Sequence, residues 1–145
     1  MFKHILIPVD GSELSLRAAQ TGIEQALLSK GKVTAIHVIS PFHTIAYLGT
    51  LLAATELAYN EEAKANAQRY LDQVKMLADA AGVSFEGVAE FGDQPYESIV
   101  QCCKDRQADL IVMGSHGWRG MTRLLLGSET HKVLLRADVP VLVCH

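Results

Sequence analysis

Short apolar runs alternate with longer amphipathic segments along this chain, and the alternation predicts a repeating strand–helix order. The run Ile5–Val9 has the character of a buried parallel strand. Asp10–Ser12 interrupts it, with Ser12 placed to cap a helix. Apolar residues then recur at helical spacing as far as Lys30-Gly31, where we expect this helix to stop.

The alternation of strands and helices continues to the end of the chain. A long amphipathic helix is expected before Gly82, a short one from Pro95, and a last one from about Ser128. The further predicted strands are Val33–Ile39, Ser84–Phe91, Leu110–Met113 and Val139–Cys144. The segment Ser40–Ala53 shows no clean period, so we expect a mobile loop or lid there.

Five strands alternating with four helices predict an α/β fold with a doubly wound, parallel five-stranded sheet and helices on both faces. Ser84–Phe91 alternates apolar and charged residues, as an exposed edge strand does. Val139–Cys144 carries no charge, but Pro140 cannot donate to a strand ladder, which indicates a second edge. The expected strand order, numbered along the chain, is therefore 3-2-1-4-5.

An apolar edge strand needs a cover. We expect the same strand, Val139–Cys144, of a second subunit to supply it in a two-fold homodimer. The alternative is a monomer in which the chain's own helices sandwich this strand.

Composition narrows the function classes. The 145 residues suffice for one domain, residues 1–145, and a net charge of −3 gives no basic surface for nucleic acid or anionic membrane. The longest mostly apolar stretch, Ile45–Ala58, contains Glu56 and is too short for a membrane span. No signal peptide is expected, and three cysteines, two of them adjacent, do not form a disulfide framework. These features favour a cytoplasmic protein.

The segment Gly114–Ser128, called the glycine segment below, contains the strongest candidate for a binding motif. Two residues separate Gly114 from Gly117, and nine separate Gly117 from Gly127, after which a helix begins. Glycines let the backbone approach an anion, and the N–H groups of a helix N-terminus then hold it. With the expected strand order, the sheet reverses between the first and fourth strands, where α/β folds bind their ligands. The segment is therefore a phosphate-site candidate.

Other motifs fit the segment less well. No Gly-Lys-Ser/Thr follows the glycines, as a Walker loop requires, and the glycine spacing differs from a Rossmann fingerprint. The six histidines show no repeated metal-ligand spacing, and only His116 is placed near a ligand. On the third helix we expect one of Cys102 and Cys103 to face the core and the other the surface, with packing preferred over redox sensing.

The spacing G-x2-G-x9-G-[S/T] resembles the nucleotide-binding signature of the universal stress protein family, in its ATP-binding subfamily. The likeness extends along the chain, through Ile5–Ser12, His37–Ile39, Ala108–Ser115 and Val139–Val143. It implies a fold like that of the adenine-nucleotide alpha hydrolases, with a dimerising last strand. It also implies ATP or another adenine nucleotide as ligand, with or without Mg²⁺.

By this resemblance, Val38 and the turn Pro8–Asp10 contact adenine and ribose, Met113 and Gly114 form the nucleoside wall, and the glycine segment holds the phosphates. The candidate binding residues are Pro8, Val9, Asp10, Val38, Met113, Gly114, His116, Gly117, Arg119, Gly127, Ser128, Glu129 and Thr130.

Several of these residues have two readings. Asp10 can accept from ribose hydroxyls or help hold a phosphate-bound Mg²⁺, or it can cap the first helix. Ser128 can donate to phosphate, serve as the N-cap, or do both. Arg119 can neutralise phosphate or remain solvated. Many relatives carry a small apolar residue in place of Glu129. A backbone N–H donated from there suits phosphate, whereas an inward carboxylate repels it.

Three functions follow. The first is a nucleotide-binding regulatory protein of the stress response, in which the ligand acts as a switch for a partner protein. The motif comes without a P-loop lysine or a nucleophile–base pair, so at most weak ATPase activity is expected. The alternatives are a slow ATP-hydrolysing enzyme that uses Asp10, and a nucleotide-independent interaction module.

Overall fold

The structure, a computed structural model, describes residues 1–46, 53–117 and 127–145. No helix within these ranges is both long and apolar enough to cross a membrane. In chain order the elements are β1 His4–Pro8, α1 Glu13–Ser29, β2 Lys32–Ile39, α2 Phe42–Ala46, α3 Ala53–Ala81, β3 Ser84–Phe91, α4 Pro95–Asp105, β4 Leu110–Gly114, α5 Ser128–Arg136 and β5 Val141–Cys144.

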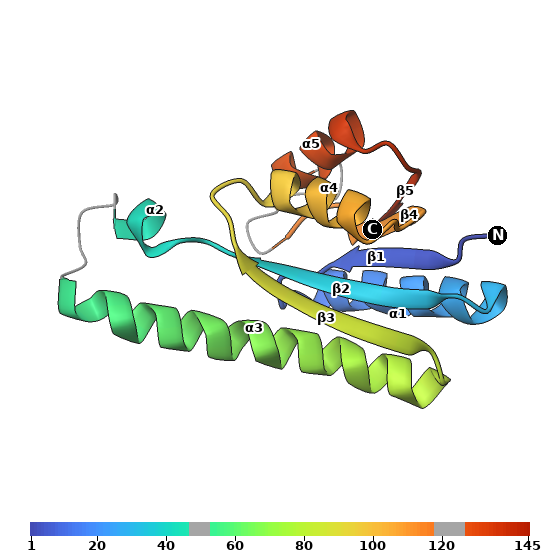
Figure 1. Cartoon of the computed structure of the whole chain (residues 1–145), viewed down its shortest axis with the longest axis horizontal. Coiled ribbons are helices and arrows are strands. Elements are labelled where there is room, and N and C mark those ends of the chain that lie inside the picture. Colours follow the sequence, from blue (N-terminus) through green and yellow to red (C-terminus); the bar gives the residue numbers. More distant parts are fainter. Residues whose placement is uncertain (47–52, 118–126) are drawn as a thin grey trace.

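The strands form one parallel sheet in the order β3-β2-β1-β4-β5, which confirms the predicted topology. In β1, Ile5 lies opposite Val33 of β2 on one side and Leu110 of β4 on the other. α1 and α3 cover one face of the sheet, and α4 and α5 cover the other (Figure 1). Each face buries its own apolar cluster, so β1 is enclosed on both faces and both edges.

Alternate residues of β1 supply the two clusters. Ile5 and Ile7 pack with α1 and α3, while Leu6 packs with α4 and α5. All three side chains are fully buried. This explains why the strand reads as a continuous apolar run rather than as an alternating one.

The ends of α1 are those that its sequence predicts. The Ser12 hydroxyl caps the helix by accepting from the Ser15 N–H at 3.2 Å. At the other end Lys30 has a left-handed backbone with φ of 53°, and the Gly31 N–H bonds to the Ala26 carbonyl. The helix therefore delivers the chain to β2 without an uncapped end.

Both predicted edge strands are edges. The charged residues of β3, Glu86 and Glu90, are exposed, as expected. β5 is shorter than predicted and begins at Val141, because Pro140 joins the sheet only through its carbonyl, which accepts from Ile111. Leu142 on this edge is 39% exposed.

Two expectations were wrong in part. The segment Ser40–Ala53, expected as a loop or lid, contains the helix α2, and α3 begins at Ala53; residues 47–52 of this segment lie outside the described residues, and the role as a lid stays a prediction. The turn after β3 anchors α2, because the Asp93 carboxylate accepts from the Thr44 hydroxyl at 2.7 Å and lies 3.0 Å from His43 Nε2. This contact joins residues about fifty positions apart, so the local pattern could not show it.

The second wrong expectation concerns α4. Cys102 and Cys103 are both buried, at 3% and 5% exposure, instead of facing opposite ways. Neighbouring helical residues point about 100° apart, and the apolar contact surface of α4 is wide enough to cover both.

His4 is a buried polar residue at the start of β1. Its Nε2 lies 2.7 Å from the Thr34 hydroxyl, and burial lowers the pKa of the imidazole, with the charge of Lys32 acting in the same direction. The folded chain therefore favours neutral His4.

We expect the free energy of unfolding to fall as the pH drops below about 6.5, the ordinary pKa of histidine. In that range the unfolded chain binds more protons at His4 than the folded chain does. The stability present above this pH is therefore lost as the pH falls toward the lowered folded pKa. The free energy of unfolding can be measured by urea denaturation at a series of pH values. It should depend less on pH in His4→Gln than in the unaltered chain, whereas the control His145→Gln, at an exposed position, should match the unaltered chain. Identical profiles for His4→Gln and the unaltered chain would contradict this assignment.

Candidate functional site

A cavity of about 490 Å³ opens where the sheet reverses direction, at the carboxyl ends of β1 and β4. The structure brings twelve of the thirteen predicted site residues into its wall. The thirteenth, Arg119, lies outside the described residues. The lining residues are Pro8, Val9, Asp10, Ser15, Ile36, His37, Val38, Ser40, Pro95, Ile99, Met113, Gly114, His116, Gly117, Gly127, Ser128, Glu129 and Thr130.

The turn after β1 is fixed by Asp10. Its Oδ1 accepts from the Ser12 N–H at 2.9 Å, and its own N–H donates to the Ser15 hydroxyl at 3.3 Å. Asp10 thus supports the start of α1, as one of its two readings proposed. Its Oδ2 faces Gly117, because a Cβ added to Gly117 would lie 2.1 Å from that oxygen. The carboxylate therefore stands between the first helix and the glycine segment.

Close packing explains the glycines. A Cβ on Gly127 would lie 3.0 Å from the His116 Cα, and the Gly127 N–H donates to the Ser115 carbonyl at 2.5 Å. The Ser115 N–H in turn donates to the carbonyl of Cys144 at the end of β5. These bonds hold both described ends of the glycine segment against the sheet.

The N-terminus of α5 points its first turn into the cavity, since Ser128, Glu129 and Thr130 all line it. The N-cap is Gly127 and not Ser128, which is the first helical residue. The reading of Ser128 as the N-cap is therefore wrong: Gly127 has the extended backbone of a cap, and Ser128 is already helical. The first N–H groups of a helix have no acceptor within it, so they can serve an anion.

Thr130 is held differently from the expected phosphate donor. It is buried, and its hydroxyl donates to the Gly114 carbonyl at 2.8 Å. In this arrangement Thr130 offers a ligand its backbone N–H, while its side chain joins α5 to the end of β4.

The Glu129 carboxylate is committed to another helix. Its Oε2 accepts from the Tyr96 N–H in the first turn of α4 at 2.9 Å, and its Oε1 lies 3.4 Å from Lys132 Nζ. No signal in the sequence pointed to this pair, because 33 positions separate the two residues.

Several apolar and polar wall residues were not predicted from the sequence, and His37 is the most informative of them. Its Nδ1 lies 2.7 Å from the Val9 carbonyl, and its ring meets the Tyr70 ring edge-on at 5.1 Å. His37 directly precedes the predicted site residue Val38 at the carboxyl end of β2. This position was the one feature of the sequence that could have identified His37 as a wall residue. The wall formed by Ile36, Val38 and Ile99 adds an apolar surface to the cavity.

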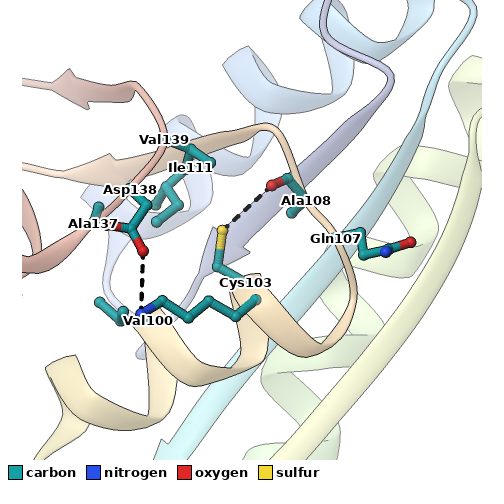
Figure 2. A pocket seen from close by; sticks show the side chains of 9 residues that line it. Val100, Cys103, Gln107, Ala108, Ile111, Ala137, Asp138 and Val139 are labelled. Atoms are coloured by element: carbon teal, nitrogen blue, oxygen red, sulfur yellow. Dashed lines mark hydrogen bonds and ion pairs between the residues drawn. The ribbon is translucent and has the colours of Figure 1, made fainter.

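A second cavity, of about 90 Å³, lies between α4 and the segment that leads to β5 (Figure 2). Cys103 lines it, with its thiol directed at the Ala108 carbonyl, and an ion pair joins Lys104 to Asp138 at 3.1 Å. Burial raises the pKa of Cys103 to about 11, so the thiol stays protonated at neutral pH. This favours packing over redox sensing.

The arrangement suits binding of an anionic ligand. The larger cavity joins an apolar wall to a helix N-terminus, which fits a molecule with a flat apolar part and a phosphate. Within the described ranges, three or more His, Cys, Asp or Glu side chains nowhere gather as a metal site would require.

Comparison with known proteins agrees with the fold. A universal stress protein from Methanocaldococcus jannaschii, MJ0531, is 38% identical over 99% of this chain and 82% of its own length. A universal stress protein from Thermus aquaticus is 34% identical, over 99% of this chain and 98% of its own.

Solved structures give the same result. The protein MJ0577, also of M. jannaschii, superposes with a TM-score of 0.84 at 28% identity, over 99% of this chain and 96% of its own. A universal stress protein solved in complex with cAMP gives a TM-score of 0.73 at 25% identity, over 99% and 97% of the two chains. The sequence model of the universal stress protein family matches residues 1–145. This chain therefore belongs to the universal stress protein family.

Proposed function

We propose that this chain binds an adenine nucleotide in the cavity between β1 and β4 and acts as a nucleotide-responsive regulatory protein. The observation that carries the proposal is the N-terminus of α5, which opens into a cavity of about 490 Å³ beside the closely packed Gly117 and Gly127. The family relative solved with cAMP supports the choice of an adenine nucleotide.

Each part of the nucleotide has a counterpart in the wall. Val9, Val38 and Met113 supply apolar surface for the base, and Asp10 supplies an acceptor for the ribose hydroxyls or a ligand for a phosphate-bound Mg²⁺. The backbone N–H groups of Ser128, Glu129 and Thr130 receive a phosphate.

We assign the ligand a regulatory role because the carboxylates in the wall already serve the structure. Asp10 accepts from Ser12 at the start of α1, and Glu129 accepts from Tyr96 at the start of α4. A bound nucleotide would thus touch groups that fix three helices, α1, α4 and α5, and would stabilise the state in which they lie together.

A Gly117→Ala variant should lose at least about tenfold in affinity for adenine nucleotides, which corresponds to about one charge-assisted hydrogen bond. The added Cβ collides with Asp10 Oδ2 and displaces the turn or the glycine segment. Isothermal titration would measure this loss. Mass spectrometry of denatured protein would show whether a nucleotide co-purifies with the unaltered chain but not with the variant.

The matched control is Gly87→Ala on β3, where a Cβ makes ordinary contacts at 3.4 Å or more and lies away from the cavity. Its affinity should equal that of the unaltered chain. If Gly117→Ala also binds with unchanged affinity, the glycine segment does not hold the phosphates as proposed. A chain that neither carries nor binds any adenine nucleotide would refute the proposed function.

We further propose that β5 pairs with β5 of a second copy. The strand is an uncharged edge of the sheet, and Leu142 on it is 39% exposed. Because the Cys144 carbonyl holds the Ser115 N–H, such an interface would border the glycine segment.

A Leu142→Glu variant should be monomeric in sedimentation analysis at concentrations where the unaltered chain is a dimer, since it places two like charges near the two-fold axis. Val141 is a poorer choice for this test because its side chain packs on the core. Leu28→Glu on α1, where Leu28 is 78% exposed, is the control and should leave the dimer intact. A dimer that survives Leu142→Glu would exclude this interface.

A further inference from the structure

Two helix N-termini meet the wall of the nucleotide cavity, one from α4 at Pro95 and one from α5 at Ser128. Each would attract an anion if its first N–H groups lacked acceptors. Their hydrogen bonds show that they differ.

Three N–H groups in the first turn of α4 already have acceptors. Pro95 has no N–H, and the N-cap Gln94 gives no side-chain bond. The N–H groups of Glu97 and Ser98 both donate to the Gln94 carbonyl, at 3.0 and 3.4 Å. The remaining donor, that of Tyr96, bonds to Glu129 Oε2. A carboxylate of the chain itself therefore occupies the place that a second phosphate could take.

The N-terminus of α5 is arranged differently. The Gly127 N–H bonds to Ser115, while Ser128, Glu129 and Thr130 follow in the first turn. Among the described residues, no group outside α5 accepts from their N–H groups, so this helix end can receive the ligand. Glu129, which fills the other end, is the second residue of the very turn that would receive a phosphate.

The charge of Glu129 is only partly balanced. Lys132 Nζ lies 3.4 Å from Oε1, but the two side chains are 36% and 43% exposed, so water screens the pair. The Lys132 ammonium also lies 5.4 Å from the centre of the Tyr96 ring, which draws it toward α4. Water therefore weakens the compensation by Lys132, and the Glu129 side chain belongs to the residue that lines the cavity at the turn that would receive a phosphate.

We propose that Glu129 selects the ligand by its phosphate charge, so that the site prefers adenine nucleotides with one phosphate over those with three. The inference rests on the proposed function. A monophosphate needs only the N-terminus of α5. A triphosphate brings about twice the negative charge toward a fixed carboxylate, and the N-terminus of α4 is closed to it.

The test compares dissociation constants for AMP and ATP, measured with EDTA so that no divalent cation offsets the charge. The unaltered chain should bind AMP more tightly than ATP. Glu129→Gln keeps an oxygen for the Tyr96 N–H but removes the charge, and it should improve ATP binding about tenfold while AMP changes less than about threefold. The difference in ATP affinity between Glu129→Gln and the unaltered chain should be largest at low ionic strength, since salt screens the repulsion between the carboxylate and the phosphates.

Two further variants fix the sign and the specificity of the effect. Lys132→Met removes the compensating cation and should weaken ATP binding relative to AMP, the opposite direction from Glu129→Gln. Glu97→Gln is the control: it removes an exposed carboxylate from the first turn of α4, outside the cavity wall. It should leave the ratio of the ATP and AMP dissociation constants unchanged.

An ATP-to-AMP ratio that stays unchanged in both Glu129→Gln and Lys132→Met, while AMP still binds, would overturn the charge selection alone. ATP binding more tightly than AMP in the unaltered chain would also overturn it. Absence of binding by AMP, ATP and adenosine alike would remove the proposed function and the inference together. Circular dichroism and thermal unfolding of each variant would confirm that the fold is retained.

Discussion

The enclosure of β1 determines the architecture around it. Its apolar residues are buried from both faces, so helices must pack on each side of the sheet. Parallel strands are joined by right-handed crossovers, and helices can reach opposite faces only if the chain changes its winding direction at the central strand. The sheet therefore grows from β1 toward β2 and β3 and later toward β4 and β5. The cavity of the proposed ligand site lies in the gap between the two directions.

The polar groups at this gap follow from a second requirement, that buried backbone donors find acceptors. Three helices begin at the cavity, and each solves the problem in its own way. Ser12 caps α1 through its side chain, and Glu129 caps α4 from a neighbouring helix. α5 has Gly127 as its N-cap, and no side chain among the described residues caps it, which is why a phosphate is proposed for its first turn.

The two edge strands of the sheet differ in the charge they carry. β3 carries two exposed carboxylates, Glu86 and Glu90, which discourage pairing with another chain. β5 carries none and reaches the glycine segment through the bond from Ser115 to Cys144. The proposed interface and the proposed ligand site are therefore joined by a direct backbone hydrogen bond.

The sequence by itself determined the strand order, the Ser12 cap and the grouping of the glycine segment with the turn after β1. Apolar periodicity, caps and edge charges are local signals, and crossover rules extend them to the topology. Only the tertiary structure decided that Glu129 caps α4, that Asp93 anchors α2, that Gly127 caps α5, and that both Cys102 and Cys103 are buried. These features depend on which side chains meet across tens of residues or on exact backbone angles, and a local pattern carries neither kind of information.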